Sequence, residues 1–131
     1  MDSYDNYSQK KSAVIKFNKI FLSLYKKCTI NTIGKTYSIY KSFGTLANSE
    51  QDQIEAFTYN EYQKDNSKKQ LLLILFFIYD YQNNMPLAKL CLDKFCDAFP
   101  WVKESRLSSV FEGYIEKYSN VKCEEGEPYC I

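Results

Sequence analysis

Eight consecutive apolar residues, Leu71 to Ile78, constrain the fold of this chain more than any other feature. A helix that crosses a membrane needs about twenty apolar residues, so this run is too short to span one. A helix that is apolar on every side must instead be buried on every side. We therefore predict a central core helix from Leu71 to about Tyr81.

The rest of the sequence favours helices as well. Only four glycines and three prolines occur in 131 residues, whereas an all-β sandwich or barrel needs turn residues about every ten positions. Apolar residues recur at steps of three and four, which is the spacing of one helical face. The expected fold class is all-α, with about six helices packed as antiparallel pairs.

The predicted helices follow from this spacing and from their capping residues. They cover residues 12–28, 34–47, 50–65, 71–81, 86–99 and 104–118. Ser49 is expected to cap the third of them, and a capping box of Ser67 and Gln70 the fourth. Pro86 lies in the first turn of the fifth helix, and Pro100 ends that helix.

The apolar positions of these helices repeat with a period of 34 residues. This offset aligns Ile39, Leu73 and Leu107, then Phe43, Phe77 and Phe111, and then Ala47, Tyr81 and Ile115. Within each helix the three positions are i, i+4 and i+8, so they form one stripe on the first helix of each successive pair. Such a period is typical of stacked helix pairs.

Residues 69–102 resemble one tetratricopeptide repeat. Four residues match the signature positions of that family: Leu75, Tyr79, Ala88 and Pro100. Phe76 and Phe95 are larger than the family usually has, and the flanking residues keep the period but lose the signature. The resemblance implies a right-handed tetratricopeptide-like stack with N-terminal and C-terminal capping helices. A generic bundle of the same helices is the alternative.

Two small families with such repeats have a similar layout. Residues 14–118 are similar in arrangement to the mitochondrial fission adaptor, although that family ends in a membrane anchor and no such segment is evident here. Residues 87–95 are similar to repeats of the repeat subunit of the endoplasmic-reticulum membrane insertase. The sequence does not decide between these two.

The residues needed for common catalytic chemistry are missing. The chain has no histidine, the commonest general base and metal ligand, and its isolated glycines form no phosphate-binding loop. Its five cysteines lack metal-binding spacing and are expected to be reduced thiols, with a disulfide between Cys123 and Cys130 as the alternative. We therefore predict no enzyme activity, no cofactor and no metal site.

The resemblance also implies a binding groove, because the first helices of such stacks line a concave surface. The partner-binding positions correspond here to Ile39, Phe43, Gln70, Leu73, Phe77, Asp80, Tyr81, Leu107, Phe111 and Tyr114. Such an apolar groove would suit a partner helix or an extended peptide. Alternatively, the helix from Val14 to Cys28 fills the groove from within the chain, and a partner binds an exposed face.

Charge is unevenly distributed along the sequence. Residues 1–45 contain eight lysines and two acidic residues, a balance of +6, whereas residues 46–131 have a balance of −5. These are either two solvated faces or a basic face that meets an acidic partner or an anionic membrane surface. The net charge of +1 gives no reason to expect a nucleic-acid partner.

The expected function is that of a non-catalytic protein–protein interaction adaptor, or of a small subunit of a larger complex. The alternative is a viral-type helical-bundle effector that sequesters a host protein. One helical repeat-like domain is expected over 12–118, between a flexible tail over 1–11 and a loose C-terminal tail over 119–131. Residues 1–11 are polar and do not form a secretory signal. A cytoplasmic location is therefore expected. A partner that resides at an organelle surface would place the protein there, and peripheral membrane association is left open.

Overall fold

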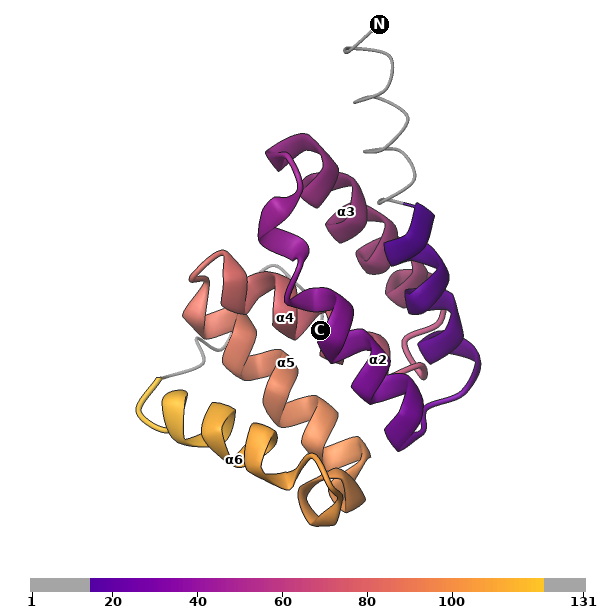
Figure 1. Cartoon of the computed structure of the whole chain (residues 1–131). Coiled ribbons are helices and arrows are strands. Elements are labelled where there is room, and N and C mark those ends of the chain that lie inside the picture. Colours follow the sequence, from indigo (N-terminus) through magenta and orange to yellow (C-terminus); the bar gives the residue numbers. More distant parts are fainter. Residues whose placement is uncertain (1–14, 122–131) are drawn as a thin grey trace, which may run out of the picture.

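The computed structural model describes residues 15–121, which form helices joined by short turns with no strand among them (Figure 1). The elements are the helical residues 15–26, here called the N-terminal helix, followed by α2 (Ile30–Tyr40), the 3-10 helix η1 (Phe43–Thr45), α3 (Asn48–Lys64), α4 (Leu71–Tyr81), α5 (Met85–Ala98), the 3-10 helix η2 (Pro100–Glu104) and α6 (Ser108–Lys117). The all-α fold class is confirmed. The predicted tail over 1–11, most of the one over 119–131 and the Cys123–Cys130 pair lie outside the described residues.

Helix α4 is the centre of the core, with the same bounds that the apolar run predicts. Every residue from Leu71 to Tyr79 is buried, and the helix packs closely against both α3 and α5 (Figure 1). Each fully buried leucine, isoleucine or phenylalanine stabilises the fold by roughly 1.5–3 kcal/mol relative to an exposed position. Helix α4 is therefore the element against which the others are positioned.

Helix α2 begins and ends earlier than the predicted helix over 34–47. Thr29 and Thr32 form a reciprocal capping box: the Thr32 N–H donates to the Thr29 hydroxyl at 3.2 Å, and the Thr29 N–H donates to the Thr32 hydroxyl at 2.9 Å. This cap satisfies backbone N–H groups that a helix start leaves unpaired. Residues 29–34 therefore cap and begin a helix, where the sequence predicts a gap between two helices.

The two caps predicted from serines are wrong. Helix α3 begins without a side-chain cap, and Ser49 lies inside it. Ser67 donates to the Asp65 carboxylate instead of capping α4. The Gln70 side-chain amide donates to the Tyr25 carbonyl at 2.7 Å. Both side chains thus make tertiary or turn contacts in place of the predicted capping box.

The end of the described chain is divided differently from the prediction. Pro100 follows α5 directly, as expected, but it also opens η2, and α6 begins only after that turn. The single helix expected over 104–118 is therefore a turn followed by a shorter helix. Arg106 and Leu107 lie in the short segment between η2 and α6, and this segment faces α2.

The arrangement of helix pairs does not establish a repeat stack. Helices α3 and α4 pack closely, as do α4 and α5, but α2 and α3 do not form a comparably close pair. The tetratricopeptide-like stack therefore stays a prediction. Between residues 15 and 121, no helix is both long and apolar enough to cross a membrane.

Candidate functional site

The ten residues predicted to line a groove fall into two groups. Six are buried in the core of the chain itself: Ile39, Phe43, Gln70, Leu73, Phe77 and Phe111. The other four reach the surface at least in part: Asp80, Tyr81, Leu107 and Tyr114. A partner can contact the second group without any opening of the core.

The N-terminal helix buries part of the predicted stripe. The Phe17 ring lies 6.0 Å from the Phe43 ring and 6.3 Å from the Tyr40 ring, measured between centroids, and Phe21 stacks on Tyr40 at 6.5 Å. The hydrogen bond from the Gln70 side chain to the Tyr25 carbonyl also joins the end of the N-terminal helix to the start of α4. This is the packing expected if the segment docks within the chain, and it shields Phe43 from solvent.

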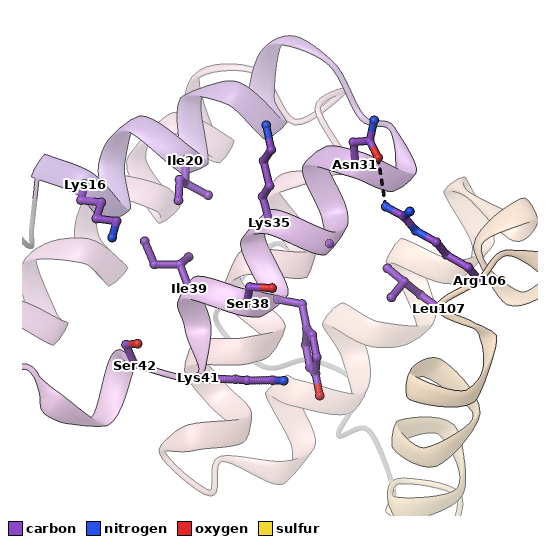
Figure 2. Close-up of a pocket in the computed structure, with 12 residues that line it drawn as sticks. Lys16, Ile20, Asn31, Lys35, Ser38, Ile39, Lys41, Ser42, Arg106 and Leu107 are labelled. Atoms are coloured by element: carbon purple, nitrogen blue, oxygen red, sulfur yellow. Dashed lines mark hydrogen bonds between the residues drawn. The ribbon is translucent and has the colours of Figure 1, made fainter.

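An open concave surface of about 720 Å³ lies along α2, and we call it the basic groove (Figure 2). The N-terminal helix supplies Lys16 and Ile20, and the segment before α6 supplies Arg106 and Leu107. Residues of α2 and its C-terminal end lie between these two walls: Asn31, Gly34, Lys35, Tyr37, Ser38, Ile39, Lys41 and Ser42. Segments far apart in the sequence therefore meet at one surface.

The basic groove carries charge of one sign. Lys16, Lys35, Lys41 and Arg106 line it, and no acidic side chain is among its described lining residues. This follows from the sequence, because Asp and Glu are absent from positions 6–49. A concave surface lined by one sign of charge attracts ligands of the opposite sign.

One wall of the basic groove is held by a hydrogen bond across the fold. The Arg106 guanidinium donates to the Asn31 side-chain oxygen at 3.0 Å (Figure 2). A Cβ added at Gly34 would come to 4.0 Å from the same guanidinium, an ordinary contact distance. Arg106 is therefore placed against α2 while its charge still faces the groove.

A second, smaller hollow of about 210 Å³ adjoins the basic groove, and we call it the aromatic pocket. It is lined by Tyr37, Tyr40, Lys41, Phe77, Asp80, Tyr81 and Tyr114, of which Tyr37 and Lys41 also line the basic groove. Four of the ten predicted groove residues meet here. Two of the ten, Ile39 and Leu107, line the basic groove.

Phe77 lies among the other rings of the aromatic pocket. Its ring centroid is 5.9 Å from that of Tyr37, 4.9 Å from that of Tyr40 and 6.1 Å from that of Tyr114. The Lys41 ammonium lies 4.7 Å from the Tyr37 ring centroid, within the range of a cation–π contact. The pocket thus has an aromatic lining and a cation at its border with the basic groove.

The one carboxylate of the aromatic pocket is already paired. Asp80 accepts a hydrogen bond from the Lys117 ammonium at 2.7 Å and another from the Tyr118 hydroxyl. Burial, followed by this hydrogen bond and the negative charge of Asp80, raises the pKa of Tyr118 well above its usual range. Burial and the same charge raise the pKa of Tyr114 to about 12. Both phenols therefore remain protonated at neutral pH.

Tyr40 contributes the least satisfied polar group of the aromatic pocket. Its side chain is only 8% exposed, and its buried hydroxyl has no hydrogen-bond partner in the described part of the chain. Burial raises its pKa well above the usual range, with the Glu55 and Asp80 charges adding to the effect. Buried polar groups in proteins are nearly always bonded, so an unpaired one calls for an explanation.

The described cysteines give no sign of a reactive centre. Burial raises the pKa of the Cys28 thiol to about 11, and burial also raises the pKa of Cys96. The nucleophilic form of cysteine is the thiolate, so a raised pKa lowers its reactivity at neutral pH. Within residues 15–121, no three side chains of the metal-binding types lie close enough to hold a metal ion.

No protein-family model, curated protein or solved structure matches this chain. Its function must therefore be inferred from the chemistry of the basic groove and the aromatic pocket. All four cations of the basic groove, Lys16, Lys35, Lys41 and Arg106, are outside the predicted set of site residues. The absence of acidic residues from positions 6–49 is a sequence signal for the three lysines, whereas no local signal pointed to Arg106.

Proposed function

We propose that the protein is a non-catalytic adaptor, or a small subunit of a larger complex, that binds an acidic helix or peptide of a partner protein in the basic groove. The observation that carries this proposal is the lining of that surface by four cations and no described carboxylate. Opposite charge on a partner would steer it to this surface and set its orientation.

Apolar side chains between the cations favour a protein partner. Ile20, Ile39 and Leu107 contribute to the basic groove from the N-terminal helix, α2 and the segment before α6. A partner helix with one apolar face and acidic flanks would cover the half-buried Ile20 and Leu107 and pair with the lysines at the same time. A partner recognised only through charge would leave this apolar surface without a role.

The proposal is tested by reversing two charges of the basic groove in the full chain. Lys16→Glu with Lys35→Glu removes two of its four cations, and neither residue lines the aromatic pocket. Lys26→Glu with Lys103→Glu is the matched control, because it changes the net charge equally at exposed positions outside the groove. Both variants are compared with wild type by affinity purification and quantitative mass spectrometry.

We expect a stoichiometric partner with wild type and with the control, and its loss from the groove variant. The partner purified in this way should also bind more weakly as salt rises from about 0.1 M to about 1 M, because the Debye length falls from about 10 Å to about 3 Å. Equal retention of the partner by both double variants, or no stoichiometric partner at all, would contradict the proposal. Recovery of nucleic acid or lipid in place of a protein would also contradict it.

A further inference from the structure

We infer that the aromatic pocket binds one large, uncharged aromatic side chain of the acidic partner segment. This inference rests on the proposed function, because the aromatic pocket adjoins the basic groove through Tyr37 and Lys41. A segment lying in the basic groove would therefore pass the mouth of this pocket. Aromatic side chains that fill a pocket commonly supply much of the binding energy of an interface.

The size of the aromatic pocket suits a single side chain. Its volume of about 210 Å³ is below the roughly 300–1,000 Å³ of pockets that hold whole small molecules. Aromatic rings line several sides of the pocket. The Phe77 ring centroid lies 4.9–6.1 Å from those of Tyr37, Tyr40 and Tyr114. Another ring can add to such a cluster through the edge-to-face and offset contacts that aromatic pairs prefer.

The charges around the aromatic pocket disfavour a cation, the other ligand that aromatic surroundings can attract. Asp80 is paired with Lys117 and accepts from Tyr118, so its negative charge is already compensated. Lys41 already places its ammonium over the Tyr37 ring. An incoming lysine or arginine would meet the uncompensated charge of Lys41, whereas a neutral ring would meet no such repulsion.

Tyr40 lines the aromatic pocket, but its hydroxyl is buried behind the pocket wall. The hydroxyl has no partner among the described residues, and its raised pKa keeps the proton that it can donate. A phenol or indole carries a polar group on an otherwise apolar ring. Such a side chain can pack its ring against the wall formed by Tyr81 and Tyr114 and keep its polar group in water.

The test uses two small probes that stand for the competing side chains. p-Cresol represents the tyrosine side chain, and tetramethylammonium represents a cation without hydrogen bonds. Each is titrated at millimolar concentration into the full chain, and the backbone amide signals are followed by NMR. We expect p-cresol to shift the signals of Tyr37, Phe77 and Tyr114 saturably, and tetramethylammonium to leave them unchanged.

Tyr81→Ala and Trp101→Ala provide the matched pair of variants. Both residues are exposed aromatics, at 49% and 41%, but only Tyr81 lines the aromatic pocket. We expect Tyr81→Ala to weaken p-cresol binding about fivefold, the change that loss of one aromatic contact produces. Trp101→Ala should leave the affinity unchanged.

Three results would overturn the inference: no saturable shift by p-cresol, stronger shifts by tetramethylammonium, or equal p-cresol affinity in wild type and Tyr81→Ala. None of them depends on Lys16 or Lys35. Failure of the p-cresol test would therefore leave the charge-reversal result standing. A failed charge-reversal test with saturable p-cresol binding would instead remove the acidic partner and keep the aromatic pocket as a binding site.

Discussion

Lys117, at the end of α6, donates to Asp80, near the end of α4, at 2.7 Å. The Asp80 side chain is 19% exposed and that of Lys117 45%, so the pair is only partly screened by water. The neighbouring Tyr118 hydroxyl donates to the same carboxylate oxygen. These two bonds join the last described helix to the central one beside the aromatic pocket.

Asp80→Asn should lower the free energy of unfolding by about 1–2 kcal/mol, because it removes the charge from two charge-assisted hydrogen bonds. Urea denaturation measures this. Glu61→Gln is the control, since it removes the charge from the exposed Lys64–Glu61 pair, and such pairs contribute about 0–1 kcal/mol. Equal effects of the two substitutions would show that the Asp80 contacts have no special weight.

Thr29→Ala should destabilise the protein by about 1 kcal/mol, because it removes the N-cap of α2. Ser49→Ala is the informative comparison. The sequence predicts a cap at Ser49, but the structure places it inside α3 without a capping bond. We expect the thermal or urea midpoint of Ser49→Ala to match that of wild type. A larger loss for Ser49→Ala than for Thr29→Ala would contradict the observed helix starts.

Gly44→Ala should displace the Tyr81 ring. A Cβ at position 44 would lie 2.9 Å from the Tyr81 hydroxyl oxygen and 3.0 Å from Cε2, too close for either to stay. Tyr81 is half exposed, so its ring can move outward at a stability cost below about 1 kcal/mol. NMR should then show loss of the contact between the Phe43 and Tyr81 rings, whose centroids are 5.3 Å apart.

Gly113→Ala is the control for that substitution. Gly113 lies within α6, and a Cβ there would meet nothing within 4 Å. It should stabilise the protein by about 0.5–1 kcal/mol, because alanine is the better helix former.

Unchanged Phe43 and Tyr81 signals in Gly44→Ala would contradict the close approach of Tyr81.

Alkaline pH should destabilise the protein, in part through Tyr114. Its pKa is about 12 in the folded state, against about 10 in an unfolded chain. Above about pH 10 the unfolded state loses this proton first, so rising pH favours unfolding. Below about pH 10 the group has no such effect.

The measurement compares urea midpoints at about pH 9 and about pH 11 in wild type and Tyr114→Phe. The phenylalanine keeps the ring that packs on Phe76 and Phe77 but has no proton to lose. We expect a smaller decrease in the variant than in wild type. An equal decrease in both proteins would show that Tyr114 does not take part.

Local patterns predicted the central elements of the fold well. The bounds of α4 follow from its unbroken apolar run, and α5 begins and ends within one residue of the predicted 86–99 because Pro86 lies in its first turn and Pro100 follows its end. The start of α2 was missed because threonine at both capping positions looks like a break in the apolar pattern. Its capping bonds become visible only when the backbone geometry is known.

The candidate site was less predictable, because it is made by contacts between distant segments. Lys16, Lys35 and Arg106 meet only after the segment before α6 folds back on α2, and the hydrogen bond from Arg106 to Asn31 spans 75 positions. The predicted stripe holds on a single helix only in α4, because Ile39, Phe43 and Ala47 are divided among α2, η1 and the N-cap of α3, and Leu107 precedes α6. The burial of the stripe could not be foreseen, since a core face and a binding face have the same composition until their neighbours are placed.

The hydrogen bond from Gln70 to Tyr25 also sets an order of assembly. It spans 45 positions and closes the N-terminal helix onto an element that is synthesised much later. The buried side chains Phe17, Phe21 and Leu24 thus have no complete core to enter until α4 has left the ribosome. Contacts of such sequence separation slow folding, and a nascent chain that exposes apolar side chains is prone to aggregate. The N-terminal helix therefore cannot complete its packing before α4 has been made.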